Sequence, residues 1–270
     1  MPAGTTEYER ECKYFDINGR QKRGMPQRGD PHHHPEVPKE SFFRRELPKH
    51  CISFSSDEGK KLFREALGEG FMENYFTLAA QYRTQSEPAF CGLGTLTMAL
   101  NALSIDPGRV WKGPWRWFSE EMLDCCTSLE LVKKQGITLG QFVCLARCNG
   151  AQASVFYGSD SDEATFRNVV ETTSKASEFV TIVSYNRGKV GQTGTGHFSP
   201  IGGYHPRKDM VLLMEVARFK YPPHWIPLSM LFEATKDVDA VTGRSRGFVT
   251  LSPSQEFCFW CSNNKISDKM

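Results

Sequence analysis

The sequence lacks the features that would place the protein in a membrane or on nucleic acid. No apolar stretch approaches the roughly 18 residues of a membrane span, and no apolar signal segment follows Met1. Its 33 basic and 31 acidic residues are interspersed, so no basic patch for nucleic acid stands out. Nine cysteines are an odd number, which does not suit a disulfide framework. We therefore expect a soluble, reduced, cytoplasmic protein.

What is present is a chain long enough to bury a large core. At 270 residues and 39% hydrophobic content, it can bury roughly 70 to 75% of the surface of the unfolded chain without disulfides. The stretch before Leu47 is polar and proline-rich around the histidine run 32–34, a composition that does not order itself. We predict a flexible tail at 1–47, with no function assigned to its histidines, and a globular domain at 48–270.

The globular part changes character near Gly150, from helical to β-rich patterns. Ser55, Ser56 and Asp57 offer caps for a first helix. Helices are predicted through residues 60–67, through 72–82 and from 91 onward. Strands are predicted at 179–186, 197–204, 210–219 and 246–252. Helices followed by strands indicate an α+β fold, with a helical lobe, an antiparallel β lobe and a ligand cleft between them.

One cysteine stands where a loop becomes an apolar helical pattern, in the stretch PAFCGLGTLTMALNAL at 88–103. Leucines at intervals of three and four residues predict one helical face, and Pro88 fits a helix entry. Cys91 thus lies at the first turn, where the helix dipole favours a thiolate and lowers the thiol pKa. Position alone leaves two alternatives, a packed core thiol and a nucleophile.

A histidine and a carboxylate in the β-rich half favour the nucleophile. The runs HFSPIGGY and MVLLMEV are joined by a short polar turn. If they pair as an antiparallel hairpin centred near Pro206, His197 directly faces Glu215, close enough for the carboxylate to hold the imidazole. A cysteine at a helix start, a histidine at a strand start and an acid opposite it make up a Cys-His-acid site.

The other motifs carry weaker signals. GKVGQTGTGH is glycine-rich but lacks the spacing of a phosphate-binding loop. CFWC, at Cys258 to Cys261, has the spacing of half a zinc site with no second half. The remaining groupings are weak candidates for binding soft metal ions, because thiolates select such ions. They are Cys125, Cys126, Cys144 and Cys148.

Several longer runs resemble a known family. QSEPAFCGL, NALSIDPGRVWKGPWRWF, MLDCC, QTGTGHFSPIGGY and VARFKYPPHW closely resemble phytochelatin synthases, which belong to the papain-like cysteine peptidase superfamily. The resemblance covers roughly Phe43 to Ser252. It implies a papain-like two-lobed fold, with the nucleophile on the helical lobe and the base on the β lobe. It also implies a dipeptidyl transfer that releases glycine from glutathione and extends phytochelatins.

The resemblance assigns roles to residues. It makes Cys91 the nucleophile, His197 the general base and Gln85 the oxyanion-hole glutamine. The third catalytic residue of the family is an aspartate, and this chain departs from the family by carrying Glu215. Five residues are implied to bind substrate: Asp239, Arg246, Gly196, Arg218 and Tyr221. Of these, the aspartate and Arg246 would hold the ammonium and carboxylate of the γ-glutamyl head.

Cofactors and partners follow from the same resemblance. We expect no tightly bound cofactor, and heavy-metal ions (Cd, Zn, Cu) as activators carried by glutathione thiolates. The expected partners are glutathione, phytochelatin peptides and metal–glutathione complexes, with a homodimer left open. The rival interpretations are a glutathione or S-conjugate hydrolase of the same fold, and a thiol-rich metal-binding protein. Because plant members continue into a cysteine-rich region and this sequence ends at Met270, we expect a fragment or a short form.

Overall fold

The structure is a computed structural model that describes residues 41–254. The chain divides into one unit that ends at Phe42 and another that begins at Phe43, and all described helices and strands lie in the second. Its α-helices are α2 (Asp57–Gly68), α3 (Glu73–Ala80), α4 (Cys91–Ala102), α5 (Leu129–Gln135), α6 (Leu139–Cys148), α7 (Glu163–Ser174) and α8 (Leu228–Thr235). Its strands are β1 (Ile52–Ser53), β2 (Ala151–Tyr157), β3 (Val180–Asn186), β4 (Gly196–His205), β5 (Met210–Leu213), β6 (His224–Pro227) and β7 (Gly247–Pro253). Short 3₁₀ turns are η1 (Glu120–Met122), η2 (Gly158–Asp160) and η3 (Arg187–Val190).

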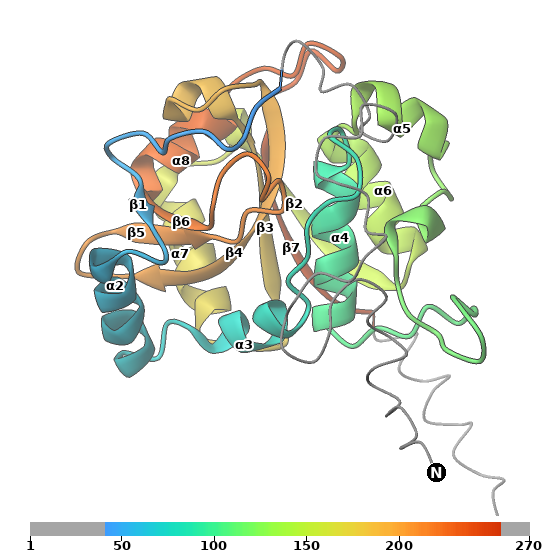
Figure 1. The fold of residues 1–270 in the computed structure, drawn as a ribbon, viewed down its shortest axis with the longest axis horizontal. Coiled ribbons are helices and arrows are strands. Elements are labelled where there is room, and N and C mark those ends of the chain that lie inside the picture. Colours follow the sequence, from blue (N-terminus) through green and yellow to red (C-terminus); the bar gives the residue numbers. More distant parts are fainter. Residues whose placement is uncertain (1–40, 255–270) are drawn as a thin grey trace, which may run out of the picture. The chain divides into compact units, whose positions relative to one another are not determined.

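The seven strands form one sheet in the order β1-β6-β5-β4-β3-β7-β2, and every pairing is antiparallel. Neighbouring residues of a strand point to opposite faces. Ile182 accordingly packs in the core that contains α4 and α6, whereas Val183 packs in the core that contains α7 and α8. Helices therefore cover both faces of the sheet (Figure 1). An α+β fold with an antiparallel sheet is confirmed, although helices also occur in the β-rich half.

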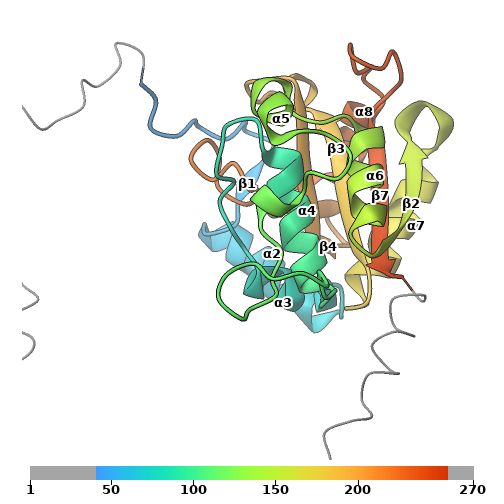
Figure 2. The ribbon, with the colours of Figure 1, turned by 90° about the vertical axis from the view of Figure 1, so that its right-hand side faces the viewer.

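Helix α4 is the central helix of one layer. It lies beside α6 against the sheet, as Figure 2 shows from the helix side. All its residues after Cys91 are buried, so the helix is enclosed around its whole circumference and not only along the predicted leucine face. Two glycines permit the close packing: a side chain at Gly92 would collide with Ile137, and one at Gly94 with Glu120. The helix start is thereby fixed in position.

The predicted hairpin exists, but its predicted register is wrong. The turn covers residues 206–209, between the paired residues His205 and Met210, and is not centred on Pro206. Asp209 closes it with a φ of 51°, a left-handed conformation that a short polar side chain tolerates. Strand β5 ends at Leu213, short of the predicted 219. Glu215 therefore lies beyond the ladder, and any contact with His197 must arise in another way.

Two predictions fall outside the described residues: most of the tail at 1–47 and the CFWC motif. Among the described residues, Ser56 caps α2 as predicted, accepting a hydrogen bond from the N–H of Gly59. Across residues 41–254, no helix combines the length and the apolar character required to cross a bilayer.

Candidate active site

A pocket of about 590 Å³ opens beside the first turn of α4. Cys91 and His197 both line it, although they come from a helix and a strand more than 100 residues apart. The lining comes from six segments, within residues 85–91, 134–141, 186–187, 194–198, 217–220 and 237–246. The fold therefore brings the predicted nucleophile and the predicted base to one cavity.

Cys91 is the first residue of α4 and is partly exposed in the pocket. Burial raises the pKa of its thiol above the ordinary value, although the backbone N–H of Phe198 donates to the sulfur and opposes the shift. The helix start acts in the predicted direction, because the N–H of Gly92 also lowers the pKa, but the predicted net lowering is wrong. The reason is that loss of water around the sulfur outweighs the favourable N–H groups. At neutral pH the thiol keeps its proton until a base removes it.

His197 is held between a carboxylate and a guanidinium. Its Nε2 lies 2.7 Å from Oε1 of Glu215 and 2.8 Å from Nη2 of Arg187. Burial, and then the Arg187 charge, lower the pKa of His197 to about 4. A neutral imidazole that donates Nε2–H to Glu215 keeps the lone pair of Nδ1 available as a proton acceptor. The ring is therefore suited to act as a base at neutral pH.

Glu215 is fully buried, and its carboxylate accepts from three groups. Oε1 faces His197 and accepts the N–H of Ala217 at 2.7 Å, while Oε2 accepts from Arg187 at 2.8 Å. Burial by itself would raise the pKa of Glu215, but His197 and Arg187 together bring it well below its ordinary range. The His–Glu contact predicted from the hairpin thus exists, although the strand register that predicted it was wrong. The glutamate side chain at position 215 is therefore long enough to accept from all three donors.

Arg187 was not predicted from the sequence. It begins η3, directly after β3, and only 3% of its surface is exposed. Besides Glu215 it donates to Oε1 of Gln192 at 2.6 Å, and Nε2 of Gln192 lies 3.0 Å from Nε2 of His224. A buried charge network therefore extends behind the imidazole. No sequence signal marked this arginine, because NRGK reads as an ordinary turn.

Gln85 lines the pocket, but its amide is engaged with its own loop. Nε2 donates to the backbone oxygens of Glu87 at 2.8 Å and Pro88 at 2.9 Å, and its buried Oε1 has no partner among the described residues. The loop is held by Glu120, which is 1% exposed and accepts the N–H of Ser86 at 3.1 Å. The position fits the predicted role, whereas donation to a substrate needs one N–H to be released.

Asp239 and Arg246 meet on the pocket wall. Their side chains form an ion pair of 3.2 Å and both are largely buried. Gly196 adjoins them, because an added Cβ there would collide with the Arg246 guanidinium. The structure therefore brings these three of the five predicted substrate-binding residues together.

The other two predicted substrate-binding residues do not line the pocket. Arg218 stacks over the ring of Tyr82, at 4.6 Å from its centroid. Tyr221 is 2% exposed, and its hydroxyl accepts the N–H of Thr193 at 2.9 Å. A direct role of either residue in substrate binding stays a prediction.

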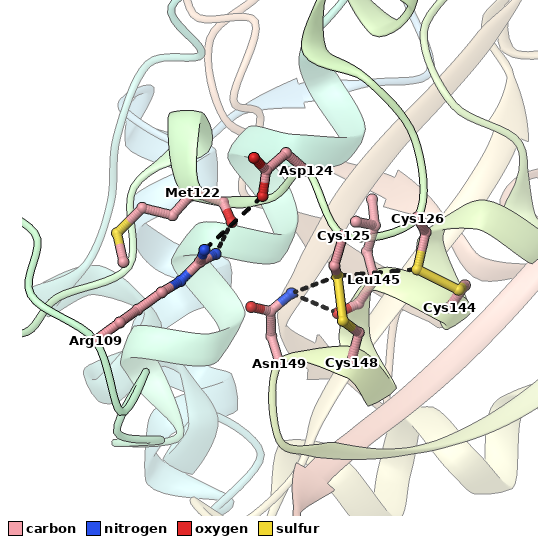
Figure 3. Close-up of a disulfide and its surroundings, with 9 residues drawn as sticks. All are labelled: Arg109, Met122, Asp124, Cys125, Cys126, Cys144, Leu145, Cys148 and Asn149. Atoms are coloured by element: carbon pink, nitrogen blue, oxygen red, sulfur yellow. Dashed lines mark hydrogen bonds and ion pairs between the residues drawn. A yellow bond between two sulfur atoms is a disulfide. The ribbon is translucent and has the colours of Figure 1, made fainter.

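The four clustered cysteines are paired as disulfides. Cys125 is joined to Cys148, and Cys126 to Cys144 (Figure 3). The expectation of reduced thiols is wrong for these four residues. In this form their sulfur atoms are not thiolates, so a role in metal binding stays a prediction that requires reduction.

A cysteine and an imidazole that line one pocket, with a buried carboxylate bonded to the imidazole, form the arrangement found in proteins that use a cysteine nucleophile. Comparison with known proteins identifies the family. The family model described as phytochelatin synthase matches residues 42–248. The chain belongs to the phytochelatin synthase family.

Individual relatives are similar over the same region. Glutathione gamma-glutamylcysteinyltransferase 3 of Lotus japonicus is 56% identical over 212 residues, which are 78% of this chain and 44% of that protein. Glutathione gamma-glutamylcysteinyltransferase 1 of Arabidopsis thaliana is 55% identical over 213 residues, 78% of this chain and 44% of that protein. The glutathione gamma-glutamylcysteinyltransferase of Schizosaccharomyces pombe is 49% identical over 215 residues, 80% of this chain and 52% of that protein. The chain thus spans about half the length of the curated relatives it matches.

Proposed function

We propose that this chain is a cysteine acyltransferase that makes phytochelatins from glutathione through an acyl-enzyme on Cys91. The carrying observation is that Cys91 shares one pocket with an imidazole held by a buried carboxylate. The names of the relatives, glutathione gamma-glutamylcysteinyltransferases, point to the acyl group and its donor. Family membership and site geometry therefore support the same reaction.

The first half-reaction begins with a neutral thiol, because burial raises the pKa of Cys91. The sulfur attacks the carbonyl carbon of the Cys–Gly bond of glutathione as Nδ1 of His197 takes the thiol proton. The tetrahedral intermediate collapses when the imidazolium gives that proton to the glycine nitrogen, and glycine leaves. A γ-glutamylcysteinyl thioester remains on Cys91. Glu215 keeps the imidazole in the required tautomer and stabilises its charged form.

The oxyanion of that intermediate needs hydrogen-bond donors. The backbone N–H of Cys91 and the Gln85 amide are the proposed donors, and removing such a donor costs roughly 10² to 10³ in rate. For Gln85, one N–H must leave the carbonyl of Glu87 or Pro88 when substrate binds. The γ-glutamyl head carries one ammonium and one carboxylate. Asp239 and Arg246 offer the complementary charges on the pocket wall.

In the second half-reaction an amine replaces the thiol of Cys91. The α-amino group of a second glutathione, or of a growing phytochelatin, attacks the thioester while His197 accepts its proton. Heavy-metal ions enter this scheme as part of the substrate, bound to glutathione thiolates. If water attacks instead, the same site is a hydrolase of glutathione or its S-conjugates, which is the second candidate.

Further expectations belong to the same proposal. The chain would form the papain-like, two-lobed catalytic domain at 48–270, with a cytoplasmic location and glutathione, phytochelatins and metal–glutathione complexes as partners. A homodimer stays a prediction. The alternative of a thiol-rich metal-binding protein without enzymatic activity is distinguished by the experiment below.

The test is to incubate the purified chain with glutathione, with and without cadmium, and to measure glycine release and the peptide products. A transferase forms γ-glutamylcysteine polymers in step with glycine release, whereas a hydrolase forms only γ-glutamylcysteine. The absence of glycine release under both conditions, from a chain shown to be folded by circular dichroism, would overturn the proposed function.

A further inference from the structure

A chain of buried hydrogen bonds extends from Arg187, behind the imidazole of His197, to the start of β6. Nη1 of Arg187 donates to Oε1 of Gln192 at 2.6 Å, and Nε2 of Gln192 lies 3.0 Å from Nε2 of His224. Nδ1 of His224 lies 2.9 Å from the backbone oxygen of Pro222. The three residues whose side chains form this chain are 3%, 4% and 0% exposed, so their polar groups depend on one another and not on bulk water.

The two ends of the chain fix the direction of every hydrogen bond in it. A guanidinium only donates and a backbone carbonyl only accepts, so Oε1 of Gln192 faces Arg187 and the proton of the His224 ring lies on Nδ1. Burial lowers the pKa of His224, although Glu215 opposes the shift, so the ring is neutral at neutral pH. Its Nε2 therefore accepts from the Gln192 amide. The side chain at position 192 must accept at one atom and donate at the other, as an amide does.

We propose that Gln192, supported by His224, is a positioning residue that holds the guanidinium of Arg187 against the neighbouring imidazole. Nη2 of Arg187 lies 2.8 Å from both Nε2 of His197 and Oε2 of Glu215. The guanidinium is planar and rigid, so the hydrogen bond from Nη1 to the amide fixes its rotation and with it the place of Nη2.

The fold also fixes the backbone of both supporting residues. The N–H of Gln192 donates to the carbonyl of Arg187 at 2.9 Å, which closes the η3 turn on itself. His224 begins β6 and pairs with Leu213, the last residue of β5, two positions before Glu215. The end of the β5–β6 ladder therefore holds the carboxylate through the backbone and the guanidinium through side chains.

A guanidinium held in this place keeps the imidazole of His197 neutral. Burial, and then the Arg187 charge, lower the pKa of His197 to about 4. The titratable or charged groups that face this ring or share its pocket are Arg187, Glu215, Lys220, Tyr185 and Cys91. If the guanidinium turns away, the imidazole holds its proton more tightly, so the pH at which the ring becomes protonated rises.

The kinetic test rests on the proposed function and follows kcat/KM for glycine release against pH. Gln192→Met removes both polar atoms of the amide. It should move the acid limb upward by about half a pH unit and lower kcat/KM at neutral pH about 10-fold. His224→Phe removes only the acceptor of the amide and should give about half that shift. His224→Gln offers an amide oxygen near the place of Nε2 and should restore the wild-type limb.

A double substitution shows whether Gln192 acts through Arg187. In an Arg187→Met chain, Gln192→Met should shift the limb no further, because the cation that the amide positions is gone. His205→Phe is the matched control, since His205 is a buried histidine of β4 that is bonded to Glu65 at 2.9 Å and does not line the pocket. It should leave the limb in place. A further shift of equal size in the Arg187→Met chain would overturn the inference.

Nitrogen NMR of the imidazoles separates this inference from the proposed function, because it needs no turnover of glutathione. The His197 signal is assigned with a His197→Gln variant and followed over the pH range in which circular dichroism shows each chain folded. It should titrate at higher pH in Gln192→Met than in the wild type, even if the chain releases no glycine. An unshifted titration in folded Gln192→Met would overturn the inference. If that variant does not fold, equal titrations of His197 in His224→Phe and His224→Gln would overturn it.

Discussion

Cys91 and the four-cysteine cluster place the same functional group in opposite surroundings. Cys91 lies in a pocket with no second sulfur paired to it, under the backbone N–H of Phe198 and near a neutral imidazole. The cluster is mostly exposed, and each sulfur has another within bonding distance. The first environment suits proton transfer and attack on carbon, whereas the second suits electron exchange between paired sulfurs.

The difference teaches how far each environment depends on the fold. The cluster joins residues separated by 23 and 18 positions, so one loop and one helix suffice to build it. The partners of Cys91 come from β4 and from the segment after β5, more than 100 residues away. Damage to distant residues should therefore affect the chemistry of Cys91 and leave the cluster unchanged.

The largest expected effect comes from removing the nucleophile. Cys91→Ala should abolish the acyl-enzyme and lower glycine release by about 10⁴-fold or more, because no other group can form the thioester. Mass spectrometry after brief exposure to glutathione should show the γ-glutamylcysteinyl adduct only on a chain that retains Cys91. Cys125→Ser with Cys148→Ser is the matched thiol control and should keep the adduct. An adduct on Cys91→Ala would refute the assignment of Cys91 as the nucleophile. It would also remove the chemical difference between Cys91 and the four-cysteine cluster.

Glu215 should give the next largest effect. Glu215→Ala removes the group that orients His197 and leaves Arg187 buried without its carboxylate, so glycine release should fall on the order of 10²-fold or more. Because this variant can also be destabilised, Glu215→Gln, which keeps the side-chain shape, is compared at a temperature where both are folded. Alkylation of the reduced cluster should be unchanged. Wild-type turnover in Glu215→Ala would leave Cys91 and His197 as a dyad oriented by another group.

Glu215→Asp tests whether the length of the side chain at this position matters for activity. Glu215 satisfies three donors at once, so Glu215→Asp should lower activity, since the shorter side chain cannot reach all of them. Higher activity in Glu215→Asp would show instead that the site is shaped for the aspartate of the resembling family.

Arg187 should change the pH dependence more than the rate. Its charge helps to lower the pKa of His197 to about 4, so the acid limb of kcat/KM should lie near that pH in the wild type. Without the cation, the imidazole holds its proton more tightly, and Arg187→Met should move the limb upward by about one pH unit or more. Arg187→Lys should restore much of the wild-type profile. Lys189→Met, which removes an exposed cation of the same turn, should have no effect; an unshifted limb in Arg187→Met would contradict a positioning role.

Gly196 should produce the smallest effect. A methyl group there collides with the guanidinium of Arg246, so Gly196→Ala should raise KM for glutathione about 10-fold with little change in kcat. Gly140→Ala is the control, because an added Cβ at that position meets only open space and one distant hydroxyl. A fall in kcat alone would place Arg246 outside substrate binding.

Local patterns in the sequence predicted the helix that carries the candidate nucleophile. The proline, cysteine and leucine spacing placed a helix beginning at Cys91, and that helix is α4. Alternating and apolar runs predicted β3, β4 and β7 to within a residue or two at most ends. These features depend on helical and strand periods, which neighbouring residues determine. Strands β1, β2 and β6 were not predicted: β1 and β6 are only two and four residues long, and β2 was missed although Asn149-Gly150 and Gly158 bound it.

The sequence by itself determined which groups the protein has: a cysteine at a helix start, a histidine at a strand start, an acid in the apolar run that follows and a local set of four cysteines. Only the tertiary structure decided how they are used. The contact of Glu215 with His197 arises beyond the end of β5 and not across a ladder, and Arg187 joins it from a turn with no distinguishing pattern. Burial reversed the expected pKa shift of Cys91. These outcomes depend on desolvation and on contacts between distant segments, and neither quantity is written in the order of residues along a chain.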